Sequence, residues 1–299
     1  MINGIINVYK EASYTSHDVV AKLRGILKQR KIGHTGTLDP DATGVLPVCL
    51  GKGTKLCDML TDADKTYEAV LELGLITDTQ DISGTVLKRR EVNVTEEEVI
   101  KVIQGFVGEY MQIPPMFSAL KVNGKKLYEL AREGKEIERQ ARKVFFHKIE
   151  IMDITLPRVT LSVTCSKGTY IRTLCHDIGE QLKCGGCMQS LIRTRVGAFQ
   201  IGDSRTLCEI EAIMENGKLD DLVISVESMF QQYPAISTKP EYDSRLYNGN
   251  TFELQHIAGE VSNSATKLRV YDSKGDFIGI YQYQEEKENF KLVKMFYER

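Results

Sequence analysis

The sequence predicts an α+β fold with a mixed, largely antiparallel sheet, followed by a small β domain at the C-terminus. Helical and strand patterns interleave along the 299 residues, and several strand patterns stand close enough together to form hairpins. Hydrophobic residues make up 42% of the chain, which is enough to fill an ordinary core. The pattern loosens near Tyr233-Pro234 and Lys239-Pro240, which predicts a linker there. We therefore place the two domains at residues 1–232 and 233–299.

The first third of the chain predicts a helix, a strand and a second helix. Thr15 or Ser16 can cap a helix over residues 17–31, where apolar residues recur at helical spacing and the other face is basic. Alternation of apolar and polar residues over 67–73 predicts a strand with one buried face, and a turn follows at 78–84. A capping box precedes a second amphipathic helix that extends to Phe106; its residues are Thr95 and Glu98.

The remaining elements are a strand, a helix and a C-terminal group of strands. Residues 159–165 alternate as a strand does, a turn follows, and 170–182 show a helical pattern. Residues 267–271 and 277–283 flank a turn sequence that is typical of a hairpin, and 290–296 predict one more strand.

The charge of the chain is distributed unevenly. Residues 1–199 carry 28 Lys or Arg against 24 Asp or Glu, whereas 200–299 carry 11 against 17. Positive charge concentrates in the segments 22–31 and 121–148, and the second of these has nine basic and four acidic residues. Such segments can bind phosphates, although a solvated helix face explains either one equally well when it is taken singly.

The cysteines and the amino terminus predict a reduced, cytoplasmic protein. The chain has seven Cys, an odd number, and its start lacks the pattern of a secretory signal. No run of 18 apolar residues predicts a membrane span. Cys184 and Cys187 form a CxxC pair, but zinc would need two further ligands at suitable spacing. We therefore expect no metal and no membrane association.

Familiar cofactor motifs are incomplete. Gly44 and Gly51 resemble the glycines of a phosphate-binding loop, but six residues separate them where that motif needs four. The acidic turn at 78–84 lacks a Glu at the distance that a calcium loop requires, and Ile82 occupies a ligand position. The sequence predicts no cofactor.

One segment, residues 32–46, is rich in turn-forming side chains between apolar flanks. Its three Gly and its Pro40 restrict or permit special backbone angles, and its Asp and Thr side chains can bind the local backbone. A rigid loop of this kind that presents His34 and Asp39 is either a structural turn or a site.

Several blocks in order, over roughly residues 3–200, make the chain resemble the TruB family of pseudouridine synthases. The blocks are residues 15–20, 33–46, 65–67, 114–121, 124–128, 131–132, 168–172, 191–194 and 197. The last 60 or so residues resemble the PUA-type RNA-binding module of such enzymes. Lys10-Glu11-Ala12-Ser13 departs from the family, in which a Lys-Pro-x-Gly turn is usual, and this puts the geometry of that turn in question.

The resemblance implies isomerisation of uridine 55 in the T-loop of tRNA to pseudouridine, by base flipping and without a cofactor. Asp39 would be the essential carboxylate. It could attack C1′ of the sugar, attack C6 of the uracil, or remove a proton to form a glycal. The carboxylate must stay ionised in a pocket where burial would raise its pKa, and in the family the Arg that corresponds to Arg172 pairs with it.

The resemblance also implies roles for four further residues. Tyr67 would stack on the target base and assist proton transfer at C5. Tyr170 and Leu191 would line the uracil pocket, although core packing explains either of them equally well. His34 would occupy the space that the flipped base vacates. The two basic segments would hold the T-arm, so binding should weaken as salt is raised.

We expect a monomer that acts on tRNA without an obligatory protein partner. One rival hypothesis is a non-catalytic RNA-binding protein on the same scaffold, which the presence of Asp39, Tyr67 and Arg172 disfavours. A second rival is a guide-RNA-dependent synthase, which would need protein partners.

Overall fold

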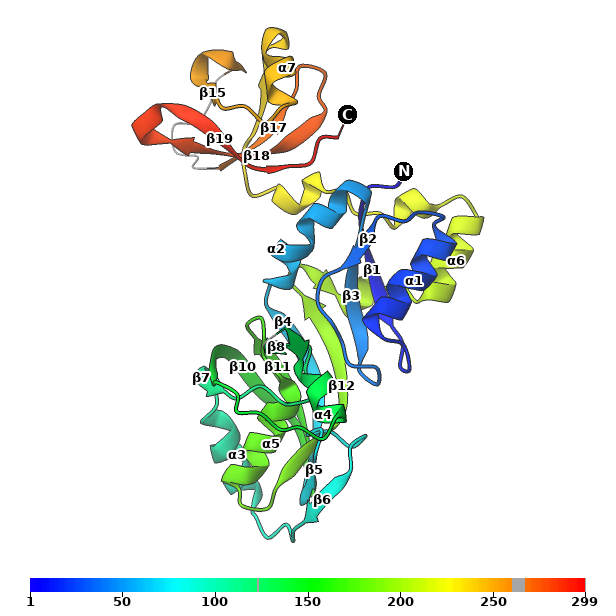
Figure 1. The fold of residues 1–299 in the computed structure, drawn as a ribbon, viewed down its shortest axis with the longest axis vertical. Helices are drawn as coiled ribbons and strands as arrows, with labels where there is room; N and C mark the ends of the chain where they lie inside the picture. The colour runs from blue at the N-terminus through cyan, green and yellow to red at the C-terminus, as the bar shows by residue number, and fades with distance from the viewer. Residues whose placement is uncertain (123, 260–266, 299) are drawn as a thin grey trace.

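The computed structural model describes residues 1–122, 124–259 and 267–298, and it is built around two sheets (Figure 1). The larger sheet extends along the body of the molecule, and the smaller one lies at one end of the long axis. Among the residues just named, no helix is long and apolar enough to cross a membrane.

In the described residues the larger sheet has nine strands, and all of its pairings are antiparallel except the one between β3 and β12. This confirms the predicted mixed, largely antiparallel sheet. In spatial order its main path is β1 (Gly4–Lys10), β3 (Thr43–Leu50), β12 (Gly186–Val196), β4 (Lys65–Leu73), β11 (Arg158–Cys165), β10 (Arg142–Thr155) and β7 (Gly108–Gln112). β2 (Ile32–His34) pairs with β3, and β13 (Phe199–Gln200) pairs with β12.

β4 is a central strand of this sheet, and its burial follows the alternation of apolar and polar residues in its sequence. Its residues alternate between buried and partly exposed positions, and it pairs with β11 on one side and β12 on the other. The buried face carries Tyr67, Ala69 and Leu71, which belong to the main hydrophobic core. The strand predicted over 67–73 is therefore confirmed.

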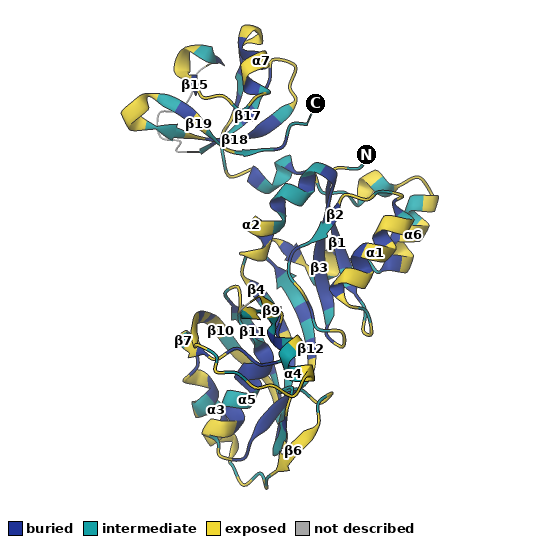
Figure 2. Cartoon of the chain, in the orientation of Figure 1, coloured by how far each residue is buried: buried dark blue, intermediate teal, exposed yellow. Residues whose placement is uncertain are grey.

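Helices pack against the sheets of both domains, and Figure 2 shows their outer faces exposed and the central strands buried. They are α1 (Ser16–Ile26), α2 (Cys57–Thr61), α3 (Glu96–Gln104), α4 (Leu127–Arg132), α5 (Ile171–Gln181), α6 (Leu207–Glu215) and α7 (Asp243–Leu246). Thr95 and Glu98 form the predicted capping box of α3, and Thr15 caps α1. The prediction that the first helix reaches residue 31 is wrong, because the chain leaves the helix at Lys28, whose φ is 49°.

Two short hairpins extend from the larger sheet. β5 (Leu75–Thr77) pairs with β6 (Val86–Arg89), and the predicted turn at 78–84 connects them. β8 (Lys121–Val122) pairs with β9 (Lys125–Lys126).

The smaller sheet confirms the C-terminal β domain. Its order is β15 (Phe252–Glu253), β19 (Asn289–Met295), β18 (Phe277–Gln284), β17 (Lys267–Tyr271), β14 (Ala235–Thr238) and β16 (Ile257–Ala258). The linker predicted around Tyr233-Pro234 and Lys239-Pro240 is interrupted, because β14 forms between these two dipeptides and pairs with β16 and β17. Ile280 and Phe296 pack in one cluster with Ile5 and Phe230 of the larger domain. The boundary at 232/233 stays a prediction.

Candidate active site

A pocket of about 840 Å³ opens beside the centre of the larger sheet. Five residues predicted for the site line it, and they are Asp39, Tyr67, Tyr170, Arg172 and Leu191. They come from four places in the fold: the loop between β2 and β3, strand β4, the start of α5, and strand β12. Segments more than a hundred residues apart in the sequence therefore meet in one pocket.

The loop that carries Asp39 is fixed by bonds to its backbone. The buried Lys10 ammonium donates to the carbonyl of Pro40 at 2.9 Å, and the Ser13 amide donates to the same oxygen at 3.0 Å. The Leu38 amide donates to the Ser16 hydroxyl at 3.0 Å. The residues on both sides of Asp39 are therefore held in place, and the carboxylate is presented from a preorganised loop.

The turn whose geometry the sequence put in question is formed without the usual glycine. Ser13 has a φ of 69°, a left-handed conformation that glycine adopts at much lower cost than serine. Its amide still reaches Pro40. The turn therefore contacts the Asp39 loop with a strained left-handed serine at this position.

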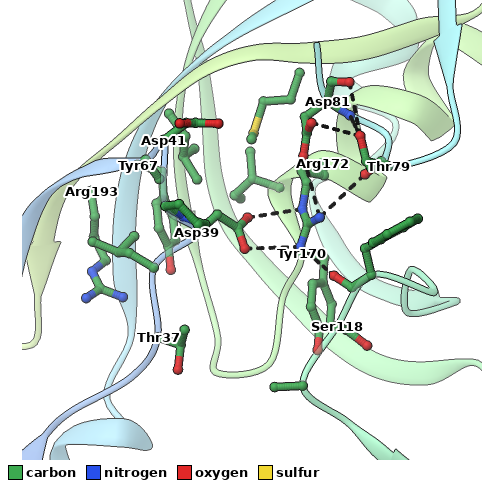
Figure 3. A pocket seen from close by; sticks show the side chains of 18 of the residues that line it. Thr37, Asp39, Asp41, Tyr67, Thr79, Asp81, Ser118, Tyr170, Arg172 and Arg193 are labelled. Carbon is green, nitrogen blue, oxygen red and sulfur yellow. Dashed lines mark hydrogen bonds and ion pairs between the residues drawn. The ribbon is translucent and has the colours of Figure 1, made fainter. Parts of the chain in front are cut away.

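Figure 3 shows the Asp39 carboxylate facing the guanidinium of Arg172. Arg172 Nε lies 3.1 Å from Asp39 Oδ2, and Nη2 lies 3.3 Å from Oδ1, so the pair is bidentate. The guanidinium is buried and also donates to the carbonyl of Phe117 at 3.0 Å. Burial raises the pKa of Asp39, and the positive charge of Arg172 opposes that rise.

Asp81 is a site residue that the sequence reasoning missed. Its Oδ2 lies 3.5 Å from Arg172 Nη1, and its negative charge contributes to raising the pKa of Asp39. Asp81 Oδ1 accepts from the Thr79 hydroxyl at 2.8 Å and from the Ser83 amide at 3.0 Å, which orders the turn. The sequence showed an acidic turn, but nothing in it indicated that the turn faces a loop some forty residues earlier.

A second missed residue is Arg193, which lies across the strand pair from Tyr67. Arg193 is 1% exposed and lines the pocket together with Tyr67. Its Nε donates to the carbonyl of Val45 at 2.7 Å, and its Nη2 donates to that of Gly36 at 3.2 Å. These two carbonyls lie before and after Asp39 in the chain, so the bonds of Arg193 help to hold the Asp39 loop in place.

Of the remaining predicted residues, Tyr170 and Leu191 line the pocket and His34 lies outside it. Tyr170 sits at the start of α5, where its amide donates to Gln112 Oε1 at 2.8 Å, and Leu191 is buried on β12. His34 does not line the pocket. It packs edge-on against His17, which does line it, with ring centroids 5.2 Å apart, and burial lowers the pKa of His34 to about 4.

The basic segment 121–148 contributes to the pocket only through its first part. Lys126 and Arg132 line the pocket, and both lie over the ring of Tyr128. Most of the later basic residues form ion pairs, for example Lys143 with Glu109. The positive charge at the pocket rim therefore comes from the β9–α4 region.

The described residues contain no group of three or more His, Cys, Asp or Glu side chains that could hold a metal ion. Cys184 and Cys187 are buried, and desolvation raises the pKa of both thiols. These thiols therefore remain protonated and unreactive at neutral pH.

Comparison with known proteins gives one consistent result. Residues 24–171 match the family model described as TruB family pseudouridylate synthase (N terminal domain), and residues 172–231 match tRNA pseudouridylate synthase B C-terminal domain. A curated protein of Lachnoclostridium phytofermentans, named tRNA pseudouridine synthase B, is 54% identical over 99% of this chain and 100% of its own length. One of the same name from Alkaliphilus oremlandii is 43% identical over 98% of this chain and 97% of its own.

Solved structures agree with the sequence comparison. A chain in the crystal structure of a Cbf5–Nop10–Gar1 complex superposes with a TM-score of 0.73 at 28% identity, over 99% of this chain and 85% of that one. A chain in the structure of an H/ACA RNP bound to a substrate RNA containing 2′-deoxyuridine gives a TM-score of 0.72 at 25% identity, over 99% and 86%.

Proposed function

The chain belongs to the TruB family of pseudouridylate synthases, and we propose that it isomerises uridine 55 in the T-loop of tRNA to pseudouridine. The observation that carries this proposal is the Asp39 carboxylate. The buried Arg172 contacts both of its oxygens, inside a pocket that Tyr67 also lines. The names of the full-length relatives support tRNA as the substrate.

We assign the essential carboxylate to Asp39. Isomerisation breaks the bond between N1 and C1′, turns the uracil, and joins C1′ to C5. An ionised carboxylate serves each open route, whether it attacks the sugar, attacks the base or removes a proton. Arg172 opposes the rise that burial causes in the pKa of Asp39, and its bidentate bonds fix the direction in which the carboxylate points.

The walls of the pocket suit a flipped pyrimidine. Tyr67 offers an aromatic face and a hydroxyl, and we assign it to stacking on the base and to proton transfer at C5. Tyr170 and Leu191 would enclose the uracil. His34, behind His17 at the pocket edge, would fill the space that the base leaves in the RNA.

Lys126 and Arg132 at the rim would contact the phosphates of the T-arm, with Tyr128 between them. We propose that the chain does this alone, as a monomer in the cytoplasm and without a cofactor. The solved relatives reported above lie in complexes with other molecules, whereas we expect this chain to act without them. Raising salt should weaken tRNA binding, and an affinity that salt does not change would contradict this assignment.

The test is release of tritium from C5 of uridine in a tRNA transcript incubated with the purified protein alone. We expect release by the wild-type chain and none by Asp39→Asn, while Asp39→Asn still binds the transcript. Asp220→Asn, an exposed carboxylate outside the pocket, is the matched control and should behave as wild type. A transcript whose target uridine is cytidine should release nothing.

Each contrary outcome contradicts a separate part of the proposal. No release by the wild-type chain contradicts independent catalysis, and release from the cytidine transcript contradicts the choice of position 55. Full activity of Asp39→Asn contradicts the role of this carboxylate.

A further inference from the structure

Arg193 is a buried positive charge without a carboxylate partner. Arg193 is 1% exposed, and no salt bridge joins it to an acid among the described residues. Its bonds to the carbonyls of Val45 and Gly36 satisfy two donors but do not neutralise the charge. Burying a charge is costly unless it is paired, so this arrangement calls for a negative charge at some stage.

The groups around Arg193 make the local field still more positive. Lys10 of β1 and Lys65 of β4 are both buried, and burial lowers the pKa of each to about 8. The charge of Arg193 contributes to lowering both values, and it also contributes to lowering the pKa of His34. Three cationic side chains therefore act on one another on this side of the pocket, and Asp41 and Asp39 oppose their effect on the pKa of Lys10.

The Tyr67 hydroxyl is the group on which this field acts. Tyr67 and Arg193 are directly opposite each other in the β4–β12 pair, and both line the pocket. In Figure 3, Arg193 and Arg172 lie on opposite sides of Asp39. Burial raises the pKa of the Tyr67 phenol, and Arg193 opposes this rise. Cys165 of β11 and Asp39 of the loop also face the phenol and raise its pKa.

One step of the reaction, removal of the proton at C5, needs a base whose negative charge is stabilised. When C1′ has joined C5, that carbon carries both the sugar and its original hydrogen, and the proton at C5 must leave. Resting on the function proposed above, we propose that Arg193 is a positioning residue that holds the Tyr67 oxygen and stabilises its negative charge so that it takes the C5 proton.

The step balances as follows. Tyr67 first loses its hydroxyl proton to water and becomes a phenolate beside the Arg193 guanidinium. The phenolate oxygen takes the C5 proton, and the electron pair of the broken C–H bond forms the C5–C6 double bond. The electrons of the C6–N1 double bond move to N1, which takes a proton from water, and Tyr67 is again a phenol.

Arg193→Met removes the charge with little change in length, and it tests the proposal under single-turnover conditions. We expect the rate to fall by about 10²–10³-fold, the loss that removal of one preorganised donor to a developing charge produces. Because Arg193 also braces the Asp39 loop, the rate alone is not decisive. The decisive reading is the isotope effect with a target uridine that carries deuterium at C5.

Under the proposal, Arg193→Met makes removal of the C5 proton rate-limiting, so the protium substrate reacts several-fold faster than the deuterium substrate. Arg193→Lys, which keeps the charge, should recover part of the rate and reduce the isotope effect. Arg195→Met removes the neighbouring arginine of the same strand, which bonds to Thr66 and Gly197 outside the pocket, and should match wild type.

A merely structural Arg193 gives a different result. Displacement of Asp39 would slow the earlier cleavage of the N1–C1′ bond, so Arg193→Met would be slow with no isotope effect, and this outcome overturns the proposal. A wild-type chain that is inactive on tRNA would instead contradict the proposed function.

A second measurement begins with the chain in which Arg193 is unchanged, so its main result does not depend on whether the Arg193→Met variant folds. A fluorinated tyrosine at position 67 has a more acidic phenol, so we expect the activity of the otherwise unaltered protein to extend to lower pH. In Arg193→Met the same replacement should restore part of the rate. An unchanged pH profile in the unaltered chain contradicts the proposal.

Discussion

Replacing Arg172 with Met should make the activity strongly pH-dependent on the acid side. The guanidinium approaches both Asp39 oxygens, at 3.1 and 3.3 Å, and an opposite charge at such a distance lowers a carboxyl pKa by about 1–3 units. Without it, burial and the nearby Asp81 raise the pKa of Asp39 unopposed by that charge. Because only the ionised carboxylate works, the acid limb should move up by about 1–3 pH units, and each unit reduces the rate below that limb about ten-fold.

The assay is tritium release from C5-labelled tRNA, measured across a pH series at saturating substrate. The deficit of Arg172→Met should be largest at low pH and should shrink as the pH rises. Arg172→Lys keeps the charge without the bidentate geometry, so its acid limb should move less. An Arg172→Met enzyme that is slower by the same factor at every pH would refute the electrostatic reasoning and leave only a steric role for this side chain.

Three further substitutions follow from the same contacts. Asp81→Asn removes a negative charge that raises the pKa of Asp39, so the acid limb should move to lower pH, opposite to the shift in Arg172→Met; a shift to higher pH would contradict this. Ser13→Gly relieves a left-handed serine and should stabilise the protein by about 1 kcal/mol in urea unfolding, and a loss of stability would show that the turn is not strained. Gly44→Ala would place a Cβ 2.2 Å from a backbone oxygen of β12 at a φ of 104°, so it should cost about 1–3 kcal/mol or more and lower the rate. Gly202→Ala, which meets nothing within 4 Å, is its control in the same unfolding and rate measurements, and equal behaviour of the two would refute the clash.

Elements whose cause is local were predictable from the sequence. The alternation in β4 and the capping box of α3 each depend on residues a few positions apart, and both are present as expected. The end of α1 was missed because Lys and Gln favour helix, whereas tertiary contacts decide here. The Gln29 side chain bonds to both the amide and the carbonyl of Ile2, which holds the chain outside the helix. β14 was missed for the same reason, since its strand partners are β16 and β17.

The site was predictable only as far as the family resemblance reached. Asp39 and Arg172 are 133 residues apart, and no property of either residue alone pairs them. Asp81 was visible as one carboxylate of an acidic turn, and Arg193 as one residue of the block 191–194, to which the resemblance gave no role at this position. Their places beside Asp39 and Tyr67 come from strand order and from the packing of the turn, which a single sequence does not encode locally.

The pKa values of Asp39 in the loop and of Lys10, which binds the loop, shift in opposite directions, and we expect both groups to contribute to the pH dependence of the activity. Burial raises the pKa of Asp39, so its carboxylate is lost as the pH falls, whereas burial lowers the pKa of Lys10 to about 8, so its charge is lost as the pH rises through that value. A neutral amine donates more weakly than an ammonium to the carbonyls of Glu11 and Pro40, which loosens the loop. Activity should therefore fall above about pH 8, and Lys10→Met should be slower throughout but lack this alkaline limb in the tritium-release profile. An alkaline limb that persists unchanged in Lys10→Met would assign it to another group.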